Sequence, residues 1–384
     1  MCRDHTTPRE RLIRMAESGG RRRLGRRTGA LAALLLGAAS LLLSGCGAPT
    51  PTPTKDAPVL PLREAAGDRI RVGTAVEGLR SSQALKDSTY ARILGTEFSS
   101  VTPENQMKWA FLQPTRGTWD FAPADEVVGF ATKHGQTVRG HTLIWHGGNP
   151  SWVSDAGMSC EAMRQTVRTH ITTVVKHYRG RVAEWDVANE LLDENGRPRP
   201  ENPFVRACGM GIVDDAFRWA RAADPDAKLF LNDYGAEAVN ARSDAYVELI
   251  RGMKARGVPI DGFGVQAHLR LKDGVPKTMG ENLARFAHLG LKVAITEADV
   301  RLDWHPGEPV SSSRQAAQAR AYAQLVKVCV DQPACTSFTV WGFTDRYSWL
   351  PEGIDGQGYA ALMTDQYTRK PAFDAVARAL YAGR

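Results

Sequence analysis

Short runs of β-branched and aromatic residues alternate along most of the chain with longer stretches whose apolar positions repeat every three to four residues. The short runs predict eight strands, at residues 70–75, 98–102, 137–143, 182–187, 228–232, 263–267, 292–296 and 337–341. The longer stretches predict helices at residues 82–94, 123–134, 161–178, 213–223, 244–256, 278–289, 313–330 and 371–380. Each predicted strand is therefore followed by a predicted helix.

This alternation predicts a parallel sheet, because parallel neighbours need a crossover of about a dozen residues or more. Eight strand–helix units in a chain of this length fit an α/β fold of the (β/α)8 barrel type, with a single catalytic domain. A doubly wound open sheet is the alternative fold. The count of eight favours a closed barrel.

The N-terminal region has a different pattern. Residues 1–45 carry nine arginines against three acidic residues, and an apolar run of 14 residues spans positions 30–43. Fourteen residues are too few to cross a bilayer as a helix, so the region is typical of a secretory leader. Residues 43–46 (Leu-Ser-Gly-Cys) resemble a bacterial lipobox, in which Cys46 is lipid-modified and becomes the mature N-terminus. An ordinary signal peptide with a chance cysteine is the alternative, and Met15 is a second candidate start.

Charge and composition narrow the possible partners. The whole chain has a net charge of +7, with 43% hydrophobic and 24% charged residues, which excludes a disordered or fibrous protein. Removal of residues 1–45 leaves 339 residues with a net charge of +1. The basic charge therefore predicts export and no nucleic-acid partner. We expect a cell-envelope lipoprotein, or alternatively a fully secreted protein, that contacts a membrane only through its lipid.

Residues 46–62 form the predicted link between leader and domain. Residues 47–62 contain five prolines, and such a segment is typical of a semi-rigid tether. Residues 63–384 contain no second linker, so these 322 residues predict one domain, which we expect to be a monomer.

Four cysteines fall within this predicted domain, and in an exported protein they are expected to pair. Cys329 and Cys335 flank a short turn, which favours their pairing and leaves Cys160 with Cys208. Four cysteines allow three connectivities, so the other two stay open. The chain has no zinc-binding spacing, phosphate-binding glycine loop or GxSxG motif, and we expect neither a metal nor a cofactor.

Polar side chains are concentrated where the predicted strands end. Two carboxylates, Glu190 and Glu297, follow the fourth and seventh strands. The other strand-end residues are Glu104, Asn105, His141, Asn189, Asn232, Asp233, Gln266, His268 and Trp341. In a parallel barrel these ends meet at one face. Two carboxylates among amides, imidazoles and aromatic rings are typical of a site that cleaves a neutral, hydroxyl-rich substrate.

Residues 185–190 (Trp-Asp-Val-Ala-Asn-Glu) and 295–299 (Ile-Thr-Glu-Ala-Asp) resemble the two carboxylate motifs of glycoside hydrolase family 10, the retaining endo-β-1,4-xylanases. The resemblance runs from about residue 71 to 373. It includes residues 102–109, 140–146, 232–234, 266–268, 341–342, 348–349 and 370–373. It implies endo-acting hydrolysis of xylan or xylo-oligosaccharides, with retention of anomeric configuration through a covalent glycosyl-enzyme intermediate.

The resemblance assigns the chemistry to two glutamates. Glu190 matches the general acid/base and Glu297 the nucleophile. Because Glu190 must begin the reaction protonated, we expect its surroundings to raise its pKa. His268 is expected to donate a hydrogen bond to Glu297, and Asp299 to orient the His268 imidazole.

The remaining matches imply contacts with sugar. Asn189 is expected to meet the 2-hydroxyl beside the reacting carbon, and Gln266 to support the site around Glu190. The residues matched to substrate-binding positions are Glu104, Asn105 and Lys108 for the non-reducing side, His141 and Trp145 for the floor of the reacting subsite, Trp341 and Trp349 for its wall, and Tyr234 for an aglycone platform.

Three positions depart from the family pattern. Gly148 stands where the family usually has a Gln that binds distal glycone sugars, Gly235 replaces an Asn, and Ala298 replaces a Leu. The Gly148 difference keeps open a preference for another β-1,4-glycan or for short xylo-oligosaccharides. A carbohydrate-binding lipoprotein with an inactive site, and a cell-envelope scaffold, are the alternatives outside enzymes.

Overall fold

A computed structural model describes residues 60–77, 83–154, 157–350 and 354–383. The predicted leader, Cys46 and nearly all of the predicted tether lie outside these residues. The folded unit comprises Leu60–Arg384. Within the described residues, no helix is both long enough and apolar enough to cross a bilayer.

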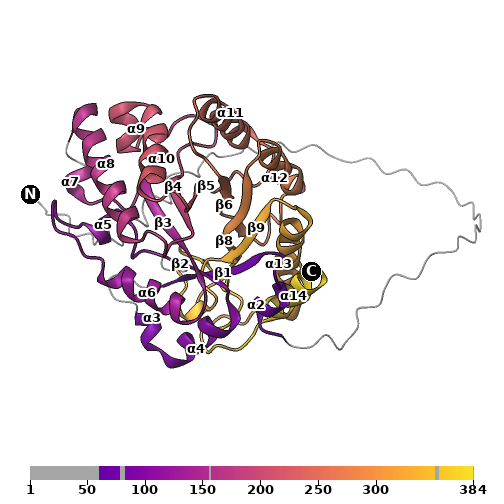
Figure 1. The fold of residues 1–384 in the computed structure, drawn as a ribbon. Coiled ribbons are helices and arrows are strands. Elements are labelled where there is room, and N and C mark those ends of the chain that lie inside the picture. Colours follow the sequence, from indigo (N-terminus) through magenta and orange to yellow (C-terminus); the bar gives the residue numbers. More distant parts are fainter. Residues whose placement is uncertain (1–59, 78–82, 155–156, 351–353, 384) are drawn as a thin grey trace, which may run out of the picture. The chain divides into compact units, whose positions relative to one another are not determined.

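Eight parallel strands form a closed barrel surrounded by helices (Figure 1). The strands are β1 (Arg71–Val76), β2 (Ser100–Pro103), β3 (Thr137–Trp145), β4 (Glu184–Asn189), β5 (Lys228–Asp233), β6 (Gly262–Val265), β8 (Lys292–Asp303) and β9 (Cys335–Val340). The sheet closes because β9 pairs with both β1 and β8. The predicted (β/α)8 barrel is therefore confirmed, and the open sheet is excluded.

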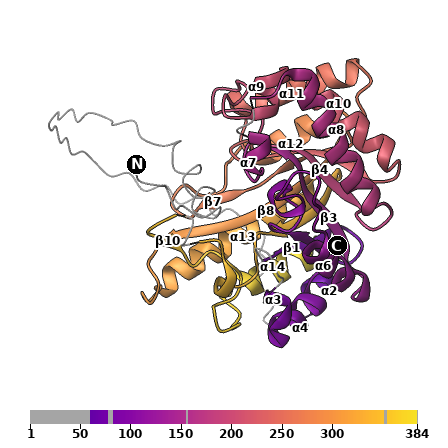
Figure 2. The ribbon, with the colours of Figure 1, turned by 90° about the vertical axis from the view of Figure 1, so that its left-hand side faces the viewer.

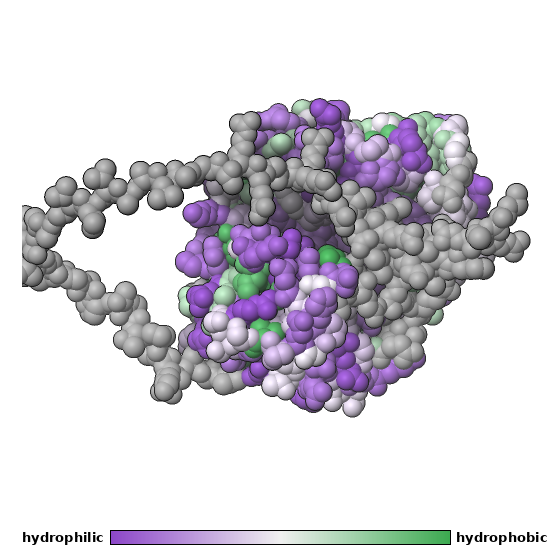
Figure 3. Space-filling model, turned by 180° about the vertical axis from the view of Figure 1, so that it is seen from behind, coloured by the Kyte–Doolittle hydropathy of each residue, from purple (hydrophilic) through white to green (hydrophobic). Residues whose placement is uncertain are grey.

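Helices before, between and after the strands pack around the barrel. They are α2 (Leu62–Ala66), α3 (Gln83–Lys86), α4 (Ser88–Glu97), α5 (Trp109–Leu112), α6 (Ala122–Lys133), α7 (Ser151–Ser154), α8 (Cys160–His177), α9 (Pro203–Cys208), α10 (Gly211–Ala223), α11 (Ala241–Ala255), α12 (Met279–His288), α13 (Ser312–Asp331) and α14 (Pro371–Ala382), with a short 3₁₀ helix, η1 (Asp345–Tyr347). Seen from behind, the described surface is mainly hydrophilic, with small separate hydrophobic areas (Figure 3).

Two short strands were not predicted. Strand β8 continues to Asp303, past the expected end at residue 296, and offers edges to β7 (His268–Arg270) and β10 (Gln357–Gly358). Figure 2 labels both short strands beside β8. The register of β7 places His268 opposite Asp299, which brings two predicted site residues together.

Two predicted boundaries also differ. The single helix expected over residues 82–94 is divided into α3 and α4, because the Asp87 side chain caps α4 by accepting from the backbone N–H groups of Thr89 and Tyr90. The folded unit also begins before residue 63. Leu62 is fully buried, and its N–H donates to Glu97 Oε2 at 2.9 Å.

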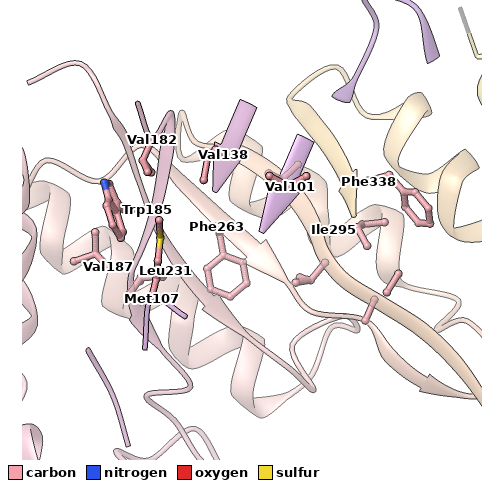
Figure 4. Close-up of a cluster of buried hydrophobic side chains, with 14 of the residues drawn as sticks. Val101, Met107, Val138, Val182, Trp185, Val187, Leu231, Phe263, Ile295 and Phe338 are labelled. Atoms are coloured by element: carbon pink, nitrogen blue, oxygen red, sulfur yellow. The ribbon is translucent and has the colours of Figure 1, made fainter. Parts of the chain in front are cut away.

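The core is a continuous cluster of buried apolar side chains. Figure 4 labels Val101, Met107, Val138, Val182, Trp185, Val187, Leu231, Phe263, Ile295 and Phe338 from this cluster. The structure contains the disulfides Cys160–Cys208 and Cys329–Cys335, the two pairs that the spacing favours.

Charged residues on β3 and β4 are also fully buried. Arg139 donates to Glu184 Oε2 at 2.9 Å and to Asp186 Oδ2 at 3.1 Å. Buried charges are tolerated when they are paired in this way. Asp186 also lies 3.0 Å from His141 Nδ1, so the buried pairs fix the orientation of an imidazole near the end of the barrel.

Candidate active site

The two predicted catalytic glutamates lie on β8 and just after β4, and both are buried. Glu190 is 9% exposed and Glu297 is 4% exposed. Glu190 directly follows β4 and adopts a φ of 53°, and its N–H donates to the carbonyl of Asn232 at 2.9 Å. Such a backbone conformation is uncommon for a residue with a side chain, and it is found disproportionately at functional sites.

Three hydrogen bonds define the surroundings of Glu297. Its Oε1 accepts from Asn232 Nδ2 at 2.7 Å, and its Oε2 lies 3.1 Å from His268 Nε2. The Thr296 hydroxyl donates to Asn232 Oδ1 at 2.7 Å, which fixes the orientation of that amide. Each oxygen of the Glu297 carboxylate therefore accepts a hydrogen bond, Oε1 from the fixed Asn232 amide and Oε2 from the His268 imidazole.

His268 lies between two carboxylates. Its Nδ1 is 2.7 Å from Asp299 Oδ2, and its Nε2 faces Glu297. Burial lowers the pKa of His268, but Asp299 and Glu297 more than offset this and raise the pKa to about 10. The imidazole is thus protonated at neutral pH and donates from both nitrogens. Asp299 also accepts from Trp349 Nε1 at 3.1 Å.

We expect NMR titration to show that the His268 imidazole stays charged at pH 8 and loses its proton only near the pKa of about 10. Because the folded-state pKa lies above the ordinary value of 6.5, the stabilisation from this charge is complete below about pH 6.5 and is lost as the pH rises through about 10. In Glu297→Gln the pKa should fall, since one of the two carboxylates is removed. A His268 that titrates near 6.5 in the parent contradicts this assignment.

The surroundings of Glu190 are different. Its Oε1 accepts from Gln266 Nε2 at 3.1 Å, and its Oε2 lies 3.7 Å from His146 Nδ1. Burial raises the pKa of Glu190, but the contacts with His146, Trp145 and Gln266, together with the Arg199 charge, bring it below its ordinary value. The expectation of a raised pKa is therefore wrong for the substrate-free protein.

Asn189 connects the two glutamates. Its Oδ1 accepts from Asn232 Nδ2 at 2.9 Å and from Gln266 Nε2 at 3.2 Å. These two donors fix the direction of the Asn189 amide. Its Nδ2 makes only a long contact, 3.4 Å, with Glu190 Oε1, and so keeps capacity to donate to a ligand.

The residues expected to bind the non-reducing side are buried and mutually bonded. Lys108 Nζ donates to Asn105 Oδ1 at 2.9 Å and lies 5.1 Å from the centre of the Trp145 ring. Burial raises the pKa of Glu104 to about 7, although Lys108 acts in the opposite direction. Burial lowers the pKa of Lys108, which Glu104 and both predicted catalytic glutamates counter. The lysine therefore belongs to the electrostatic environment of both glutamates.

Aromatic rings surround the imidazoles. The Trp341 ring makes edge contacts with His141 at 5.3 Å and with His268 at 6.1 Å between ring centres. The Trp349 ring lies 5.3 Å from that of His268. Tyr234 is more exposed, at 37%, and its hydroxyl accepts from Arg199 Nη2 at 2.7 Å. Trp341 and Trp349 thus lie beside the predicted site imidazoles, whereas the ring of Tyr234 is held by Arg199 at a more exposed position.

Several residues that contribute to the site were given no individual role in it from the sequence. Asn232 holds Glu297 and Asn189, Asp186 holds His141, and Arg199 holds Tyr234. Asn232 ends a predicted strand and Asp186 lies inside the motif of residues 185–190, so the positions of both in the sequence indicated that they lie near the site. Arg199 lies in the long segment after β4, and no pattern marks it.

The local backbone conformation explains why residue 148 is a glycine. Its φ is +63°, and a Cβ there would lie 3.2 Å from the Trp145 ring and 3.4 Å from Lys108 Cβ. A larger residue would strain the backbone and crowd two predicted binding residues. The backbone conformation at position 148 therefore favours glycine over the Gln that the family usually has there.

Comparison with known proteins agrees with this geometry. The family description "Glycosyl hydrolase family 10" matches residues 62–379. An endo-1,4-beta-xylanase of Agaricus bisporus is 37% identical over 79% of this chain and 89% of that protein. Endo-1,4-beta-xylanase B of Thermotoga neapolitana is 39% identical over 75% of this chain and 82% of that protein. The crystal structure of xylanase 10B from Thermotoga petrophila RKU-1 in complex with xylobiose superimposes with a TM-score of 0.80, at 37% identity, over 85% of this chain and 99% of that one.

Proposed function

The chain belongs to glycosyl hydrolase family 10, and from that membership we propose that it is an endo-β-1,4-xylanase that retains anomeric configuration, with Glu190 as acid/base and Glu297 as nucleophile. One observation carries these roles. The two carboxylates share one hydrogen-bonded network through Asn189 and Asn232, yet only Glu297 is held by a protonated imidazole.

In the first step, a Glu297 oxygen attacks the anomeric carbon while Glu190 transfers its proton to the glycosidic oxygen. The bond between that carbon and oxygen breaks, the aglycone leaves as an alcohol, and an ester links the sugar to Glu297. Asn232 and the His268 cation hold the nucleophile in place for this attack. Asn189 Nδ2 lies 3.4 Å from Glu190 Oε1 and has a second hydrogen with which to donate to the 2-hydroxyl of the reacting sugar.

In the second step, Glu190 is a carboxylate and takes a proton from water. That water attacks the anomeric carbon from the side that the aglycone left, and the ester bond to Glu297 breaks. Two inversions give net retention. Glu190 ends protonated and Glu297 ionised, as both began.

The lowered pKa of Glu190 describes the free protein. A bound sugar displaces water from the carboxyl group and adds to the burial that already raises its pKa. Binding itself therefore favours the protonated acid that the first step requires. Proton uptake on substrate binding, measured by calorimetry in buffers of different ionisation enthalpy, tests this coupling, and no uptake contradicts it.

The substrate follows from the aromatic and amide residues of the site. Trp341, Trp349 and Tyr234 present faces and edges suited to sugar rings, and Lys108, Asn105 and Asn189 offer donors to hydroxyl groups. The similar Thermotoga petrophila structure holds xylobiose. Gly148 removes one side chain from the distal glycone side, so we propose that binding there is weaker than binding next to the cleaved bond.

The time course of xylan digestion tests the proposed function. Because the enzyme cuts internally, we expect xylo-oligosaccharides of many lengths early, which later shorten to di- and trisaccharides. Release of only xylose or xylobiose from the start contradicts internal cleavage. Equal or faster hydrolysis of a β-1,4-glucan or β-1,4-mannan under the same conditions contradicts the substrate.

We also propose that the protein is exported, since its two disulfides are typical of an oxidising compartment. The lipid at Cys46 stays a prediction from the sequence, because Cys46 lies outside the described residues. Mass spectrometry of the mature N-terminal peptide tests it, and an unmodified N-terminus contradicts it.

A further inference from the structure

Ala267 has an unusual backbone between two site residues. Its φ is 62°, and its side chain is fully buried. This left-handed conformation is disfavoured for residues with a Cβ, so the surrounding structure must enforce it. Gln266 on one side contacts Glu190, and His268 on the other side contacts Glu297. The torsion angles of Ala267 therefore set the relative direction of the two side chains that hold the two glutamates.

The flanking backbone is held mainly by strands. The N–H of Gln266 donates to the carbonyl of Asp233 at 3.0 Å, and the carbonyl of Gln266 accepts from the N–H of Glu297 at 3.0 Å. The carbonyl of Ala267 accepts from the N–H of Asp299 at 3.3 Å. None of these bonds uses the buried N–H of Ala267, which is left for a side chain to satisfy.

Glu237 supplies that acceptor. Its Oε1 accepts from the N–H of Ala267 at 3.0 Å, and the residue is only 5% exposed. Burial raises the pKa of Glu237, although the N–H groups of Glu237 and Ala267 and the charges of His268 and Arg242 act in the opposite direction. Burying a carboxyl group this deeply costs folding free energy unless hydrogen bonds compensate for the lost contacts with water.

The backbone beside Glu237 is itself anchored. Asn282 of α12 donates from Nδ2 to the carbonyl of Ala236 at 2.7 Å and, at 3.4 Å, to that of Glu237. Asn282 is fully buried. The contact between Glu237 and Ala267 thus joins the turn after β6 to a fixed point on a neighbouring helix.

We propose that Glu237 is a positioning residue that holds Ala267 in its left-handed conformation and thereby sets Gln266 against Glu190 and His268 against Glu297. This inference rests on the roles proposed for the two glutamates. Glu237 has no role in proton transfer or nucleophilic attack. It acts by fixing one peptide group on which both halves of the site depend.

A double-mutant cycle tests this proposal with Glu237→Met, which keeps the length of the side chain and removes the acceptor. Glu237→Gln keeps a carbonyl oxygen and serves as the conservative control. Ala267→Gly removes the Cβ that disfavours the left-handed region, so the turn should depend less on Glu237 in that background. Each variant is assayed for kcat and KM on xylan and on an aryl β-xylobioside, and its unfolding temperature is measured.

We expect Glu237→Met to lower kcat about 10- to 100-fold, because small displacements of catalytic partners have effects of this size, and to change KM less than about threefold. Glu237→Gln should stay within about fivefold of the parent kcat. In the Ala267→Gly background, the factor by which Glu237→Met lowers kcat should be at least about threefold smaller than in the parent. If Glu237→Met alone does not fold, the double variant, relieved of the strain at residue 267, is compared with Ala267→Gly.

Three results would overturn the proposal. The first is that Glu237→Met keeps the parental kcat. The second is that Glu237→Gln loses as much kcat as Glu237→Met. The third is that Glu237→Met lowers kcat by the same factor with Ala267 and with Gly at position 267. Failure of the proposed function is distinct, because it appears as a parent protein that does not hydrolyse xylan or the aryl xylobioside at all.

Discussion

Glu297→Ala should lower kcat on xylan by about 10,000-fold or more, because Glu297 is, among the described residues, the one carboxylate that both Asn232 and His268 hold, and its removal leaves no nucleophile there. Release of reducing ends from xylan measures the loss. Glu97→Gln is the matched control, since Glu97 is also a buried carboxylate, and its partners in the described part of the chain are Leu62 and Arg369, which are not predicted site residues. We expect the control to keep parental kcat.

Added azide distinguishes loss of a nucleophile from general damage. In Glu297→Ala, azide can occupy the space of the missing carboxylate and attack an aryl xylobioside with an acidic phenol as leaving group. A single displacement then gives a glycosyl azide of inverted configuration. Restored turnover with a retained azide product, or activity of Glu297→Ala near that of the parent, contradicts the role of Glu297.

Glu190→Ala should have an effect that depends on the leaving group. With xylan the departing alcohol needs a proton, so kcat/KM should fall about 100- to 10,000-fold. With an aryl xylobioside whose phenol leaves without protonation, formation of the glycosyl-enzyme should proceed at nearly the parental rate. Pre-steady-state release of the phenol measures this step.

Slow hydrolysis of the accumulated intermediate should then limit turnover in Glu190→Ala, because the general base is also missing. Azide needs no base and should accelerate turnover with retained configuration, the opposite stereochemistry to Glu297→Ala. An equal loss on xylan and on the activated substrate contradicts the role of Glu190 as acid.

The barrel could be predicted from sequence because its strands and helices are long and regular enough to show their periodicity. Strand β7 could not be predicted, since its three residues gain their pairing only from the extension of β8. The division between α3 and α4 depends on the Asp87 cap, whose side chain must reach two backbone N–H groups. Both features depend on which groups meet in the folded structure, and the pattern of hydrophobic and polar residues does not record this.

The site could be predicted as a set of strand-end residues, but not as a network. The position of Asn232 at a strand end indicated the site, and only the structure shows that its amide joins Glu297 to Asn189. The direction of the Glu190 pKa shift depends on His146 and Arg199, which lie outside its motif. Glu237 reaches Ala267 from a separate loop, 30 residues away in sequence.

The configuration of the first sugar product is the most direct test of a covalent intermediate on Glu297. Proton NMR during the first minutes of xylo-oligosaccharide hydrolysis at high enzyme concentration resolves the two anomers before they equilibrate. Attack by Glu297 followed by attack of water predicts that the β-anomer appears first and the α-anomer only later by mutarotation. Initial appearance of the α-anomer would mean that water attacks the substrate directly, and it would contradict the covalent intermediate on Glu297.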